Sequence, residues 1–71
     1  MKGIYVFKTS VKRKIEIKNL SPALNNLLKP NNAWNFDLED RDKILRVEME
    51  EKKKASIENL LHSYGFVCEE M

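Results

Sequence analysis

The chain has 71 residues, of which 42% are hydrophobic and 34% charged, with one cysteine and a formal net charge of +2. This length suffices for one domain with a limited core, so we expect residues 1–71 to form a single domain. One cysteine excludes a disulfide within the chain, and so small a net charge does not by itself indicate nucleic-acid binding.

The hydropathy pattern predicts a soluble cytoplasmic protein. No apolar run approaches the roughly 18 residues of a membrane span, and lysines interrupt the first segment too early for a secretory signal. A lone thiol also suits a reducing compartment. We therefore expect a cytoplasmic location and no membrane partner.

The first half of the chain predicts a strand followed by a helix. Residues 4–9 are rich in β-branched and aromatic side chains, which favours a strand. An apolar stripe with helical spacing then predicts a helix over residues 15–29. Ser21-Pro22 is also a typical helix start, but the stripe begins earlier, so we predict a helix that is irregular in its first turns. The stripe consists of Ile17, Leu20, Leu24 and Leu27.

The middle of the chain predicts a β-hairpin. Residues 29–32 contain a proline and two asparagines, which break the helix. Apolar and polar residues alternate from Trp34 to Leu38, which is typical of a half-buried strand. A polar turn over residues 39–42 leads to a second alternating strand at residues 43–50.

The last third predicts a helix and a short closing strand. Ile57, Leu60, Leu61 and Tyr64 have helical spacing, which indicates a helix over residues 53–64. Gly65 follows at the position where a left-handed C-terminal cap is needed. Residues 66–69 are apolar enough for a fourth strand. The order βαββαβ, with one apolar side per element, predicts an α+β fold: a ferredoxin-like sandwich with both helices on one face of a four-stranded antiparallel sheet.

Several segments resemble the heavy-metal-associated domains, which include small copper and heavy-metal chaperones. Tyr5–Val11 resembles the first strand of that family, Ser21–Leu24 its proline-containing first helix, and Asp37–Glu48 its hairpin. Tyr64–Phe66 resembles the glycine-aromatic pair that ends the second helix. The resemblance covers nearly the whole chain and implies a metallochaperone-like scaffold.

The chain departs from this family at the metal loop. Counted from the end of the first strand, the two cysteines of the family's C-x-x-C motif would fall at Arg13 and Glu16. A guanidinium has no lone pair to give a cation, and Glu16 offers one carboxylate among Lys12, Arg13 and Lys14. We therefore expect a degenerate site with no metal and no other cofactor.

The remaining soft ligands do not suggest a site either. Cys68 falls on the last predicted strand, where a free cysteine is typically a small buried apolar residue. His62 lies off the apolar stripe of its helix, so we expect it in solvent. The sequence shows no nucleophile paired with a base, and we expect no enzymatic activity.

The first functional hypothesis is a protein-interaction or regulatory module. The basic loop would steer docking to an acidic protein surface, because charge complementarity sets the rate and orientation of encounter. The expected docking residues are Lys12, Arg13, Lys14 and Phe66. The alternative for the loop is a solvated segment that only maintains solubility.

Two further hypotheses belong to other classes. Cys68 could retain weak heavy-metal binding, shared between two molecules, as a transport accessory. RNA-recognition domains use the same order of elements, but they stack bases on aromatic residues of the central strands. The predicted strand Ile44–Glu50 has no aromatic residue and carries Glu48 and Glu50, and we expect Trp34 and Phe36 to belong to the core. We therefore expect no nucleic-acid partner.

Overall fold

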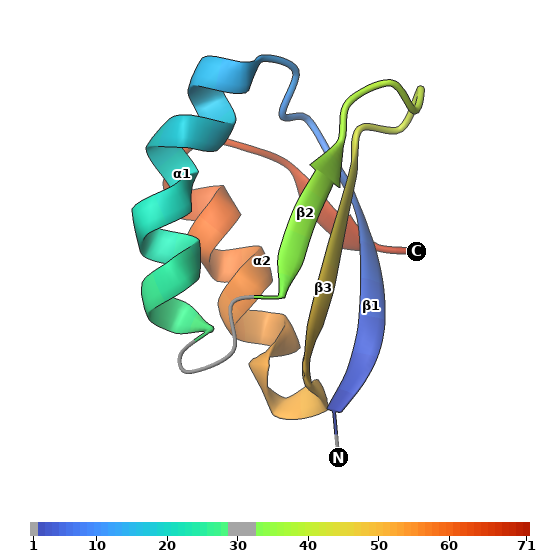
Figure 1. The fold of residues 1–71 in the computed structure, drawn as a ribbon, viewed down its shortest axis with the longest axis vertical. Helices are drawn as coiled ribbons and strands as arrows, with labels where there is room; N and C mark the ends of the chain where they lie inside the picture. Colours follow the sequence, from blue (N-terminus) through green and yellow to red (C-terminus); the bar gives the residue numbers. More distant parts are fainter. Residues whose placement is uncertain (1, 29–32) are drawn as a thin grey trace.

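A computed structural model describes residues 2–28 and 33–71. The predicted turn over residues 29–32 lies outside these ranges. The elements follow the predicted order (Figure 1): β1 (Lys2–Thr9), α1 (Lys14–Leu27), β2 (Trp34–Asp37), β3 (Ile44–Glu50), the 3-10 turn η1 (Glu51–Lys53), α2 (Lys54–Ser63) and β4 (Cys68–Glu70).

The four strands form one antiparallel sheet in the order β2-β3-β1-β4. Both helices lie together on one side of it (Figure 1). This confirms the predicted α+β fold, and the strand order is compatible with a ferredoxin-like sandwich. No helix within residues 2–28 and 33–71 is long and apolar enough to cross a lipid bilayer.

The pairing register explains which side of the sheet is buried. Tyr5 and Trp34 both lie opposite Val47, and Phe7 and Phe36 both lie opposite Leu45, so these six side chains share one face. That face packs on the helices and forms the core. The fully buried members of the core are Phe7, Val11, Leu20, Leu24, Leu45, Val47, Ile57, Leu61 and Cys68.

α1 begins at Lys14, ahead of the proline, as the apolar stripe predicts. Pro22 lies inside the helix, so the reading of Ser21 as an N-cap is wrong. The Ser21 hydroxyl instead donates to the carbonyl oxygen of Ile17 at 2.9 Å. Because proline has no N–H, the carbonyl of Lys18 loses its usual helical donor.

α2 ends in the predicted left-handed cap. Gly65 has a φ of 88°, and its N–H donates to the His62 carbonyl while the N–H of Phe66 donates to the Leu61 carbonyl, both at 2.9 Å. This pair of bonds is a Schellman motif. It explains why the last strand starts at Cys68 and not at residue 66 as predicted, because Phe66 still belongs to the helix cap.

Candidate docking site at the start of α1

The loop between β1 and α1 is held in place by hydrogen bonds to two other segments of the chain. The Thr9 hydroxyl donates to the Lys43 carbonyl at 2.7 Å and accepts from the Val11 N–H at 3.2 Å. The Ser10 N–H donates to the Val67 carbonyl at 3.2 Å, and the Val67 N–H donates to the Ser10 hydroxyl at 2.8 Å. The loop therefore rests on the β2–β3 hairpin and on the segment that follows α2.

Glu16 closes the first turn of α1. Its Oε1 accepts the backbone N–H groups of Lys12 and Arg13, each at 2.9 Å. These bonds satisfy donors that the start of a helix otherwise leaves unpaired, as the carboxylate of a capping box does. They also lower the pKa of Glu16, with the nearby charges of Arg13 and Lys12 as lesser causes.

The Glu16 carboxylate thus has a structural role. Arg13 is the N-cap residue, and one guanidinium nitrogen lies 3.9 Å from Glu16 Oε2, a loose ion pair at the surface. Neither side chain is arranged to hold a cation. Within the described residues, no group of three or more histidine, cysteine, aspartate or glutamate side chains could hold a metal ion.

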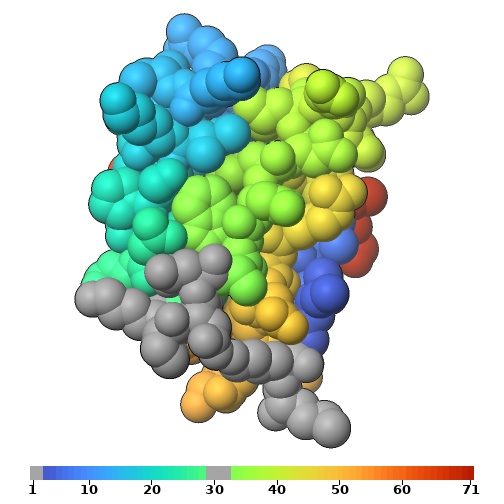
Figure 2. Space-filling view, viewed as in Figure 1, coloured from blue at the N-terminus to red at the C-terminus, as the bar shows by residue number. Residues whose placement is uncertain are grey.

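Three cations and an apolar side chain are exposed where α1 begins. Lys12, Arg13 and Lys14 are all exposed, and Ile15 exposes 53% of its surface. Figure 2 shows this blue segment projecting at the same end of the molecule as the yellow-green β2–β3 hairpin. The positive end of a helix dipole disfavours cations, and only Glu16 offsets it within the first turn of α1.

Phe66 does not share the exposure of the basic loop. It is half-buried and packs against the core. Its neighbour Val67 is 52% exposed, and its backbone is hydrogen-bonded to Ser10 at the edge of the loop. The contact between Ser10 and Val67 is not predictable from local sequence patterns, because the two residues are far apart in the chain.

The two soft ligands lie where the sequence predicts. Cys68 is 1% exposed, and burial raises the pKa of its thiol to about 12, with Glu58 and Glu69 as lesser causes. The thiolate that a soft metal needs is therefore disfavoured. His62 is exposed on α2, as expected.

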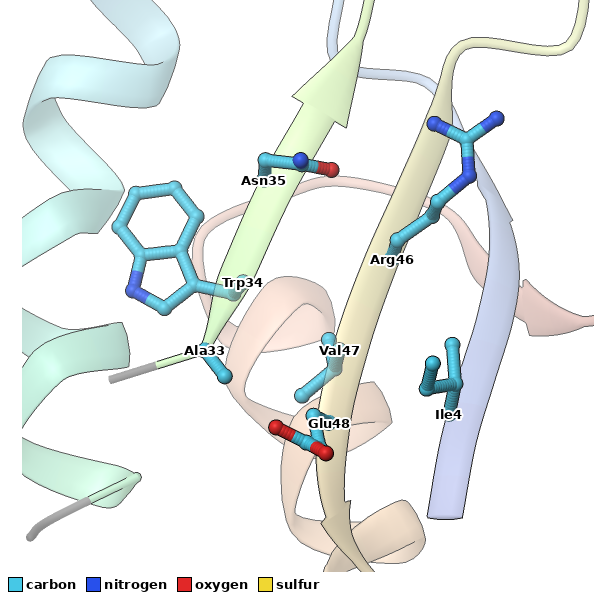
Figure 3. Close-up of a pocket in the computed structure, with 7 residues that line it drawn as sticks. All are labelled: Ile4, Ala33, Trp34, Asn35, Arg46, Val47 and Glu48. Atoms are coloured by element: carbon cyan, nitrogen blue, oxygen red, sulfur yellow. The ribbon is translucent and has the colours of Figure 1, made fainter. Parts of the chain in front are cut away.

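The open face of the sheet carries no aromatic side chain among the described strand residues. Tyr5, Phe7, Trp34 and Phe36 all share the helix-covered face. Trp34 packs edge-on against Phe36, with ring centroids 5.9 Å apart, and its indole N–H donates to Asn25 on α1 at 2.8 Å. Figure 3 shows a hollow beside β2 and β3 that is lined by Trp34 and Val47 as well as by the open-face residues Ile4, Arg46 and Glu48.

Comparison of the chain with known protein families, curated proteins and solved structures finds no match. The resemblance to heavy-metal-associated domains therefore stays a prediction from the sequence.

Proposed function

We propose that this chain is a non-enzymatic cytoplasmic interaction domain that docks on an acidic protein surface through Lys12, Arg13 and Lys14. The observation that carries the proposal is the placement of three exposed cations against the dipole of α1, with Ile15 exposed beside them. An arrangement that opposes helix stability is understandable if it serves binding. The exposed apolar side chain would add contact area to the electrostatic attraction.

The geometry of the loop also supports docking. Its backbone is tied to Lys43 and Val67, so the cations project from a fixed base. A preorganised site loses less conformational freedom on binding than a mobile one. Long-range attraction by the three charges would raise the rate of encounter with a negatively charged partner.

Metal and RNA binding have less support. Glu16 is a single carboxylate that already accepts two N–H groups, and the raised pKa of Cys68 disfavours the thiolate that a soft metal needs. Stacking of bases on the open face would need aromatic side chains there, and the four aromatic residues of β1 and β2 point to the helices.

The test is a titration with a short polyglutamate peptide, followed through backbone amide chemical shifts. We expect saturable shifts confined to residues 12–16, with an affinity that falls as salt is added. The double variant Arg13→Glu/Lys14→Glu should lose these shifts. The matched control is Arg41→Glu/Lys52→Glu, which makes the same change in net charge at two other exposed cations and should bind like the unmodified protein.

The proposal fails if the peptide shifts amides near lysines all over the surface, or if both double variants lose binding equally. Either result would leave the basic segment as a solvated loop. Salt-dependent binding of a single-stranded RNA, with no response to polyglutamate, would favour the RNA hypothesis instead.

A further inference from the structure

The sheet has two edges, and the pairing register shows which backbone groups point outward from each. The Glu48 N–H donates to the Ala33 carbonyl at 2.7 Å, which makes residues 33 and 48 a hydrogen-bonded pair. Because such pairs alternate along an antiparallel ladder, Asn35 and Asp37 also face β3 with their backbone groups. The N–H and C=O groups of Trp34 and Phe36 therefore point to the outer edge of β2.

The same reasoning applies to β4. The Ser10 N–H donates to Val67, and the Met71 N–H donates to Val6 at 2.9 Å. Residue pairs 10/67, 8/69 and 6/71 are therefore hydrogen-bonded, and Cys68 and Glu70 direct their backbone groups outward. Each edge strand thus has two outward-facing residues that a further strand could pair with.

We propose that β2 pairs antiparallel with β2 of a second copy of this chain, so that two sheets join into one continuous sheet. Addition of a strand at an exposed edge is a general mode of association, and a two-fold axis lets the same edge serve both partners. The proposal is independent of the basic segment at the start of α1.

The register of this pairing follows from the outward-pointing backbone groups. Only one two-fold arrangement uses both outward residues of each strand, and it places Trp34 opposite Phe36 of the second copy. Both side chains lie on the helix-covered face, where aromatic cross-strand pairs are favourable. Asn35 then lies opposite itself at the axis, and Asp37 lies opposite Ala33, so no like charges meet.

The charge pattern selects β2 over β4. The corresponding arrangement of two β4 strands would place Glu69 directly opposite Glu69, which is repulsive. Glu70 is also engaged already, because its carboxylate lies 2.8 Å from the Lys54 ammonium group. β4 therefore has the acidic protection that is common on edge strands, whereas Asn35 at the centre of β2 is neutral.

Among the described residues, there is space beside β2. A hollow runs beside β2 next to α1, lined by Lys14, Ile17, Phe36 and Leu38 among others. Residues of β2 also form part of the molecular surface between α1 and β3, shown in green in Figure 2. A second β2 would cover the half-buried rings of Trp34 and Phe36.

A charge-swap experiment at the axis tests this proposal. Asn35 is exposed, so Asn35→Asp and Asn35→Lys should fold normally, which circular dichroism would verify. By sedimentation equilibrium, we expect the unmodified protein to form a concentration-dependent dimer. Each variant alone should dimerise at least about fivefold more weakly, because like charges then meet at the axis. An equimolar mixture of the two variants should recover the dimer.

Asn19→Asp makes the same change at an exposed position of α1 and should leave the dimer unchanged. The proposal is overturned if the unmodified protein stays monomeric throughout the micromolar-to-millimolar range. It is equally overturned if the two variants associate as the unmodified protein does, or if their mixture remains monomeric.

Discussion

At the scale of single residues, Glu16 shows how one carboxylate can organise the start of a helix. A sulfur at this position could bind a soft metal, whereas the carboxylate here accepts two backbone N–H groups. From its chemistry, the sequence predicts that this loop holds no soft metal, and that stays a prediction. The sequence does not by itself reveal that Glu16 caps α1, because this role depends on the conformation of the loop that precedes the helix.

Replacement of Glu16 by Gln should lower the melting temperature at neutral pH. The pKa of Glu16 is lowered in the folded protein, so its contribution is present above the ordinary carboxyl pKa of 4.5 and is lost as the pH falls through the lowered value. Thermal unfolding from pH 7 down to pH 2 should therefore show the two proteins converging in acid.

The matched control for this prediction is Glu39→Gln, an exposed carboxylate on the β2–β3 hairpin. We expect it to change the melting temperature less than Glu16→Gln at neutral pH. Equal effects of the two substitutions would mean that the cap contributes no more than general surface charge.

At the scale of elements, the interior proline of α1 is the clearest conflict between local preference and the fold. An isolated segment would prefer to begin a helix at Pro22, yet Leu20 and Ile17 are needed on the buried face. Burial of the stripe outweighs the missing hydrogen bond at the Lys18 carbonyl. The native protein is therefore less stable than it would be without a proline at this position.

Pro22→Ala should therefore stabilise the protein by about 1–3 kcal/mol, because it restores a donor to the Lys18 carbonyl and removes an interior proline. Pro22 is exposed, so no core contact is lost. Urea-induced unfolding would measure the gain. Asn26→Ala on the same helix should gain only about 0.5 kcal/mol, from helix propensity alone. A loss of stability in Pro22→Ala would show that the ring itself supports the helix.

Most elements are predictable from the sequence. The exceptions depend on contacts that form only in the folded chain. Alternation in β2 and β3, and the apolar stripes of both helices, are local patterns and predict the elements well. The sequence predicts the start of β4 two residues too early, because Phe66 donates to Leu61 in the helix cap. The exposure of Ile15 was not indicated, since only the assembled fold determines which residues the core covers.

At the scale of the whole molecule, a small core leaves little reserve of stability. A domain of this size has about 3–5 kcal/mol of net stability, and Leu45 lies fully buried at the centre of the sheet. Leu45→Ala should cost about 2–5 kcal/mol and leave a large fraction of the chain unfolded at 25 °C. Far-ultraviolet circular dichroism, with urea titration where folding persists, would measure this.

Ile4 provides the control for that substitution, because it lies on β1 but on the open face, with 72% of its surface exposed. We expect Ile4→Ala to change stability by less than about 1 kcal/mol. If it destabilised as much as Leu45→Ala, the open face would have to be covered in solution.

The reciprocal bonds between Ser10 and Val67 have a consequence for how the molecule opens. They join the residue that follows β1 to the residue that precedes β4, so the end of β1 and the start of β4 are held together by the same pair of hydrogen bonds. Local fraying of the final strand would therefore remove one of the two anchors of the basic loop, while the contact of Thr9 with Lys43 would remain. Amide protons at these two positions should therefore exchange with solvent water together, as members of one opening unit.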